Sequence, residues 1–131
     1  MSYSKTWLLV LALIGVGLAQ NSGWIQLESG TDAQLNKLFF TDEQTGWIVG
    51  DMVILNTTNG GDAWTVQDFP NCFFRSLSFI DNNRGFAVGH LKDSIDGILY
   101  RTDNGGLSWQ AQDTTEQELL DIVFVDADTG Y

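Results

Sequence analysis

A stretch of ten residues recurs three times in this chain without gaps, and this repeat limits the folds that the chain can adopt. Each copy joins an apolar segment, an Asp, a short polar turn, a Gly and an aromatic residue, and the copies are residues 38–47, 77–86 and 122–131. The aspartates of successive copies lie 39 and 45 residues apart. A period of this length is typical of proteins built from repeated units that pack on their neighbours.

A second element follows each complete copy and places a Trp after a glycine turn. Its recurring residues are a Thr, an Asn, a Gly and a Trp, found at Thr57, Asn59, Gly61, Trp64 and again at Thr102, Asn104, Gly106, Trp109. A short alternating strand follows both tryptophans, and Trp24 begins a similar strand without a preceding turn. The Asn-Gly and Gly-Gly steps favour tight hairpins.

One period therefore contains four short strands, which we place in the first copy at residues 35–41, 47–50, 52–57 and 63–67. Four antiparallel strands in about 40–45 residues is the period of a propeller blade. The sequence predicts an all-β fold, a β-propeller of four-stranded antiparallel blades, because a ring of neighbours covers both apolar faces of every blade.

Within this chain we expect one closing strand at residues 24–28, two blades and the start of a third. Residues 20–131 would then be the N-terminal part of a β-propeller, about two and a half blades of a truncated ring. A ring needs at least about four blades to close, so we expect the natural protein to continue.

Residues 1–19 have the organisation of a signal peptide. Lys5 supplies the positive charge, residues 7–18 form an apolar run of 12, and small residues at Gly17 and Ala19 suit cleavage after Ala19. The run is shorter than the ~20 residues that cross a bilayer, so we expect no membrane span after signal removal. The protein would be exported to the periplasm, the cell surface or the medium.

Charge and composition exclude several classes of function. The formal net charge is −11, with 17 acidic and 6 basic residues, and a surface of this sign repels nucleic acid. Cys72 and His90 are the only residues of their types, so neither an internal disulfide nor a Cys/His zinc site can form. We expect no cofactor and no metal, and we place Cys72 at a blade junction as a small buried group.

The turn-and-Trp element resembles the Asp-box, or BNR repeat, whose pattern runs Ser/Thr-x-Asp-x-Gly-x-Thr-Trp. Thr57, Gly61 and Trp64 match it, as do their counterparts in the second copy, whereas Asn59 and Asn104 stand where the family has Asp. With the Gly-aromatic-x-Val-Gly strand before it, the whole period is similar to the photosystem II stability and assembly factor-like propeller repeat.

This resemblance implies an exported, non-enzymatic propeller that acts as a binding or scaffold module for a protein or glycan partner, in a thylakoid lumen if the organism is photosynthetic. The alternative that it leaves open is the early blades of an exported glycoside hydrolase of sialidase or xyloglucanase type. No pair of acids is marked by the sequence as the catalytic pair that such an enzyme needs, so we predict no catalytic residue here.

Three features have a functional and a structural interpretation. Trp24, Trp64 and Trp109 could stack on sugars, but their fixed place in the repeat favours packing between blades. Residues 126–130 resemble half of a calcium loop, but a hairpin turn closed by Asp and Gly fits the other copies better. His90 and Lys92 lie in an insertion after Gly89 and are the candidate binding residues, although a solvated loop explains them too.

Overall fold

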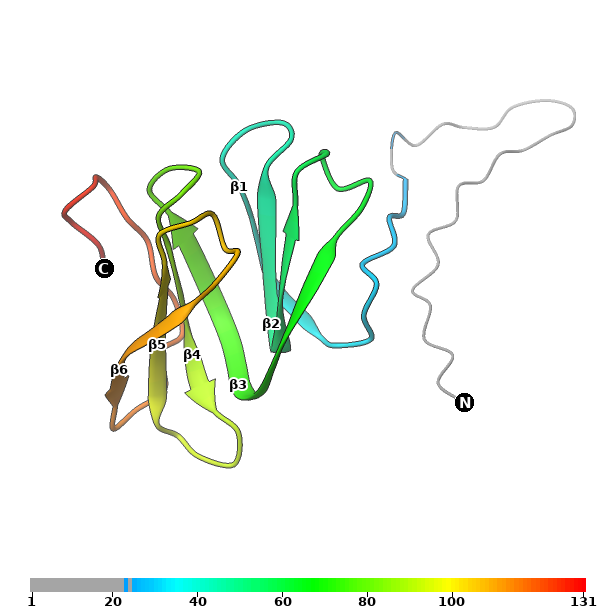
Figure 1. The fold of residues 1–131 in the computed structure, drawn as a ribbon. Coiled ribbons are helices and arrows are strands. Elements are labelled where there is room, and N and C mark those ends of the chain that lie inside the picture. The colour runs from blue at the N-terminus through cyan, green and yellow to red at the C-terminus, as the bar shows by residue number, and fades with distance from the viewer. Residues whose placement is uncertain (1–22, 24) are drawn as a thin grey trace, which may run out of the picture.

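The computed structural model describes residue 23 and residues 25–131 of the chain, so the signal peptide predicted at 1–19 and Trp24 lie outside the described residues. Six antiparallel strands follow one another in space in the order of the sequence (Figure 1). They are β1 (Leu35–Phe40), β2 (Gly46–Thr57), β3 (Thr65–Phe79), β4 (Gly85–Leu91), β5 (Gly97–Thr102) and β6 (Gln110–Thr115). Among the described residues, no helix is long and apolar enough to span a bilayer.

Strand β2 folds back on itself near its middle. Asn56 Nδ2 donates a hydrogen bond of 3.1 Å to Gly46 O, whereas ten residues of straight strand would separate them by about 33 Å. The reversal lies at Met52, whose φ of 64° is left-handed. β2 therefore provides the second and third strands of the first blade, as the sequence predicts for residues 47–50 and 52–57.

Strand β3 connects two blades through a bend. Its first residues pair with the end of β2, between Thr65↔Asn56 and Asp68↔Val53. From Cys72 onward it pairs with β4 instead. The first blade thus comprises β1, the two halves of β2 and residues 65–68, and the second comprises residues 72–79, β4, β5 and β6 (Figure 1).

The third copy of the repeat begins with the same turn as the other two. Its one β-bridge joins Phe124 to Gly130, and Val125 N donates to Thr129 O at 3.0 Å. The equivalent bonds are Thr41 N to Thr45 O at 3.1 Å and Ile80 N to Arg84 O at 2.9 Å. The start of a third blade is therefore present as a turn rather than as a full strand.

The closing strand expected at residues 24–28 is not formed over residues 25–28. A strand needs a hydrogen-bonded neighbour, and in a closed ring this neighbour belongs to the last blade. No strand of the described residues lies in that place. Leu27 packs instead near the glycine turn of the first blade, because its Cδ1 would lie 3.1 Å from a Cβ built on Gly61.

The core lies between the two blades. Trp47 and Phe79 stack with ring centroids 3.6 Å apart and an interplanar angle of 15°, and Trp47 Nε1 donates to Gly105 O of the second blade at 2.9 Å. Cys72 is 5% exposed and belongs to the same cluster, as predicted. Phe86 stacks on Phe124 in the equivalent way at 4.7 Å, so an aromatic residue of each blade covers a Phe of the next.

The outer faces of the first blade and of the third copy remain exposed. Leu38 and Phe40 on the first are 54% and 37% exposed, and Val125 and Tyr131 on the other are 65% and 79% exposed. An apolar hollow of about 520 Å³ lies over the first blade. Apolar faces of this kind are the ones that neighbouring blades cover in a closed propeller.

Candidate functional site

The first glycine turn is stabilised by hydrogen bonds between its own recurring residues. Thr57 Oγ1 donates to Asn59 Oδ1 at 2.9 Å and accepts from the backbone N–H of Asn59 and Gly61 at 3.3 and 3.0 Å. Asn59 Oδ1 also accepts from Ala63 N at 3.0 Å. Thr57 is buried, with 1% of its surface exposed, so these bonds satisfy polar groups that have lost access to water.

The second glycine turn has the same geometry. Thr102 Oγ1 donates to Asn104 Oδ1 at 2.9 Å and accepts from the N–H groups of Asn104 and Gly106 at 3.3 and 2.9 Å. Asn104 Oδ1 accepts from Ser108 N at 3.0 Å. The amide oxygen of Asn therefore makes the turn contacts without a carboxylate, and the recurring polar groups of both turns are used within the turns.

Replacing Thr102 by Val is expected to lower the free energy of unfolding by about 1–3 kcal/mol, because the buried N–H of Gly106 loses its acceptor while side-chain volume is kept. Thr57→Val should have a similar effect, and urea unfolding of both variants is the measurement. Replacement of Ser108 by Ala is the matched control in the same turn: it removes only the exposed bond from Asn104 Nδ2 to Ser108 Oγ and should change stability by less than about 0.5 kcal/mol. Equal losses in the Thr and Ser variants would contradict this account.

The tryptophans of the two turns lie against phenylalanines. Trp64 contacts Phe40 edge-on with centroids 6.2 Å apart, and Trp109 contacts Phe79 edge-on at 5.9 Å. Both are half-buried. These contacts support the packing interpretation rather than sugar stacking, whereas Trp24 lies outside the described residues.

The aspartate of each repeat binds the backbone of its own turn. Asp42 and Asp81 each accept N–H groups from residues two and three positions further on, at 2.7–2.8 Å, and Asp126 accepts from Asp128 N at 2.9 Å. These backbone bonds hold the pKa of all three carboxyls below the usual value. The geometry is that of a hairpin turn. Within the described residues, no group of three or more His, Cys, Asp or Glu could hold a metal ion.

These lowered pKa values predict that the fold loses stability in acid. A carboxyl with a depressed pKa stabilises the folded state fully above its unfolded pKa of about 3.9, and this stabilisation is lost as the pH falls through the folded pKa. Asp81→Asn should therefore flatten the fall in stability below about pH 4, measured by urea unfolding at several pH values. Asp62→Asn is the control, because no described donor bonds the Asp62 carboxylate. An unchanged pH profile in Asp81→Asn would contradict the prediction.

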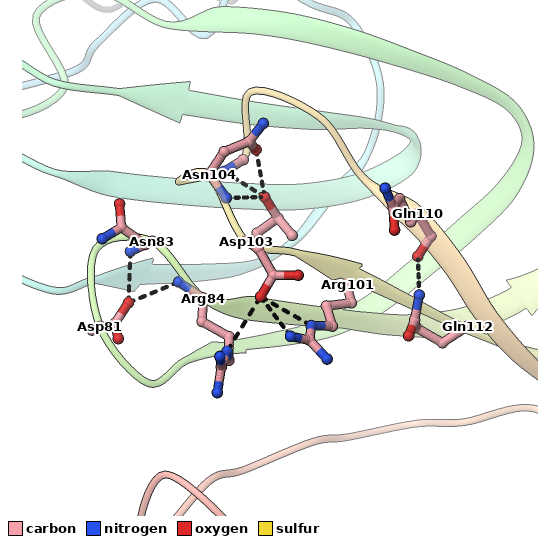
Figure 2. A network of polar contacts seen from close by, with 10 residues as sticks. Asp81, Asn83, Arg84, Arg101, Asp103, Asn104, Gln110 and Gln112 are labelled. Carbon is pink, nitrogen blue, oxygen red and sulfur yellow. Dashed lines mark hydrogen bonds and ion pairs between the residues drawn. The ribbon is translucent and has the colours of Figure 1, made fainter.

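An ion-pair network connects the two turns of the second blade (Figure 2). Asp103 Oδ1 accepts from Arg101 Nη2 at 2.7 Å and from Arg84 Nε at 3.2 Å, and Arg101 chiefly lowers the pKa of the Asp103 carboxyl. Arg101 also lies 5.9 Å above the Phe86 ring. All three charged groups are about one-third to one-half exposed, so the network contributes little stability, and its arginines are already paired.

The turns of each blade define two edges. The Trp rim is the edge formed by residues 41–45, 57–64, 80–84 and 102–109. On this edge the glycine turns bond to the turns beside them, from Gly60 N to Gln44 O at 2.9 Å and from Gly105 N to Asn83 O at 2.8 Å. The loop rim is the opposite edge, formed by residues 51–52, 70–71 and 92–96. There Lys92 N donates to Asn71 O at 2.8 Å. In Figure 1 the loop rim is the lower edge.

Lys92, one of the two predicted binding residues, lies on the loop rim, whereas His90, the other, lies near the end of β4 beside that rim. His90 Nδ1 lies 2.9 Å from Leu91 O, and Nε2 lies 2.9 Å from Arg75 Nη2 and 3.9 Å from Glu118 Oε2. Arg75 Nη1 lies 3.5 Å from Asp51 Oδ1. Lys92 is exposed, and its ammonium forms no ion pair with any described residue. Of the two, His90 is therefore bonded to described groups, whereas the Lys92 ammonium has no ion-pair partner among the described residues.

The Asp51–Arg75–His90 chain was missed in the sequence. Asp51 belongs to the turn of β2, and the other two lie on neighbouring strands, so no spacing in the chain unites them. The one available signal was that Asp51 and His90 lie beside the ends of predicted strands at the same edge of the blades, and nothing marked Arg75.

Comparisons with known proteins agree with this fold. Residues 16–113 match the family model described as photosynthesis system II assembly factor YCF48. A solved structure titled "YCF48 bound to D1 peptide" is 24% identical, with a TM-score of 0.62, over 76% of this chain and 34% of the other. This chain therefore spans about a third of that protein. None of the curated protein sequences matches.

The likeness to that structure confirms the predicted fold, a β-propeller segment built from four-stranded antiparallel blades. Because the matched model covers most of the described residues, with the first blade and all but the last two residues of the second, the chain belongs to the BNR-repeat family described as photosynthesis system II assembly factor YCF48.

Proposed function

We propose that this protein is an exported, non-enzymatic propeller that binds another protein and acts as a scaffold. Membership in an assembly-factor family supports this role. The solved relative is, by its title, bound to a peptide, which favours a protein over a glycan as partner.

The observation that carries the proposal is the contrast between the two rims. On the Trp rim, the recurring Thr, Asn and Asp side chains are bonded within their own turns. On the loop rim, the second blade replaces the tight turn at Met52 by the longer loop of residues 92–96, which presents Lys92 without an ion-pair partner among the described residues. Loops that depart from a repeat are where recognition is usually found.

Photo-crosslinking tests this proposal directly. A photoreactive phenylalanine analogue at Lys92 should crosslink a discrete protein of the exported fraction, whereas the same analogue at Leu107 should not. Leu107 is the matched control because it is 77% exposed on the Trp rim. Equal yields at both positions, or none at either, would refute a protein-binding loop rim.

Export is tested separately. The positive charge at Lys5, the apolar run of residues 7–18 and the small residues before position 20 support a cleaved signal peptide. The protein recovered outside the cytoplasm should begin at Gln20 on N-terminal sequencing. Recovery of the protein inside the cells with Met1 or Ser2 still in place would contradict export.

A further inference from the structure

A hollow of about 700 Å³ lies on the loop rim of the first blade. It is bounded by the segment that leads into β1, by the turn of β2 and by the bend of β3, which meet at the lower edge in Figure 1. A hydrogen bond of 2.8 Å from Asp51 N to Gln34 O connects the turn of β2 to the segment that leads into β1. We call this hollow the rim groove.

The floor of the rim groove is apolar. Met52, Val53, Pro70 and Phe73 line it. Met52 adopts a left-handed φ of 64°, where glycine would be less strained. A thioether side chain is therefore held at this position despite the cost in backbone conformation. Met side chains adapt to differently shaped apolar partners.

The walls of the rim groove are acidic. Asp32 and Asp68 line it and are exposed, and no described side chain or backbone group bonds to either carboxylate. Asp51 lines it too, but its Oδ1 already accepts from Asn36 Nδ2 at 3.1 Å and faces Arg75. Two carboxylates without a described partner therefore line the same hollow as the apolar side chains, on a protein whose net charge of −11 adds a field of the same sign.

We propose that the rim groove binds a segment of a partner protein in which a Lys or Arg lies beside an apolar side chain. The apolar side chain would pack on Met52 and Phe73, and the cation would lie between Asp32 and Asp68. Charge complementarity of this kind sets specificity and association rate. The inference rests on the proposed function and names the chemistry of the partner.

The test uses three capped pentapeptides with central sequences Lys-Phe-Lys, Glu-Phe-Glu and Lys-Ser-Lys, titrated into the protein and followed by amide chemical shifts in NMR. The first should bind most tightly and shift the amides of residues 31–34, 51–53, 68–69 and 71–73. The double substitution Asp32→Asn with Asp68→Asn should weaken it about fivefold, and added salt should do the same. Glu43→Gln with Asp62→Asn removes the same charge from the Trp rim and should leave affinity unchanged.

A second variant separates binding from folding. Met52→Gly relieves the left-handed strain, so its unfolding midpoint should not fall, whereas affinity for the Lys-Phe-Lys peptide should drop about tenfold because the apolar floor is lost. Loss of stability without loss of affinity would show that Met52 serves only the fold.

Three results would overturn the proposal. These are tighter binding of the Glu-Phe-Glu peptide, shifts confined to the Trp rim, and affinity that survives the Asp32 and Asp68 substitutions. If crosslinking at Lys92 still captures a partner in the Asp32 and Asp68 variants, the proposal for the rim groove is wrong, while the proposed scaffold function stands. If Lys92 captures nothing in the unaltered protein, the scaffold function itself fails.

Discussion

Replacing Phe79 by Ala is expected to lower the free energy of unfolding by about 3–5 kcal/mol, the range for removing a buried Phe from a packed core. Phe79 is 5% exposed and contacts aromatic rings of both blades, stacking on Trp47 at 3.6 Å and meeting Trp109 edge-on at 5.9 Å. Its ring also covers Gly85, where a Cβ would lie 2.5 Å from it. Urea unfolding with a fitted free energy measures the loss.

Phe40 is the matched control for this variant. It occupies the same position in the first blade and covers Gly46 in the same way, but it lies on an exposed face and is 37% exposed. Phe40→Ala should therefore cost only about 1–2 kcal/mol, since less apolar area leaves the protein interior. Equal losses at the two positions would show that stacking between blades contributes nothing.

Replacing Gly89 by Ala is expected to cost about 3 kcal/mol or more and to abolish the native fold if the protein is marginally stable. A Cβ on Gly89 would lie 1.9 Å from Phe73 O, a backbone atom of the paired strand. The strand bulges there, between Phe74 and Ser76. Because a backbone oxygen cannot move aside as a side chain does, β3 and β4 would have to separate locally.

A second glycine distinguishes this clash from ordinary strain. Gly60 has a φ of 71°, and its nearest contact with an added Cβ is 3.1 Å. Gly60→Ala should cost only about 1 kcal/mol, the penalty of a left-handed conformation. Circular dichroism and urea unfolding of both variants provide the measurement, and a Gly89→Ala protein as stable as Gly60→Ala would refute the close approach of the strands.

The local structure of the blades could be predicted from the sequence because it depends on residues close together in the chain. The Thr57 and Asn59 bonds span at most four residues, and the Asp81 bonds at most three. Such contacts form wherever the residue pattern recurs, so three aligned copies predict three equivalent turns. The repeat period then predicts a blade and its neighbours.

Contacts between blades could not be predicted in the same way. In the sequence Trp47 is only the aromatic residue that ends the first repeat, yet in the structure it is fully buried and its Nε1 donates to Gly105 O, 58 residues away. The strand expected at residues 24–28 is not formed over its described residues 25–28, because strand formation depends on a neighbouring strand and not on the segment itself.

The sequence by itself therefore determined the repeat unit, its turns and the propeller class, since these follow from short-range hydrogen bonds and alternating apolar residues. Only the tertiary structure decided which residues meet at the loop rim. The rim groove and the Asp51–Arg75–His90 chain join segments that the sequence separates. These segments meet because β2 and β3 bend and because adjacent blades pack together. Neither the bends nor the packing can be predicted from the spacing of residues along the chain.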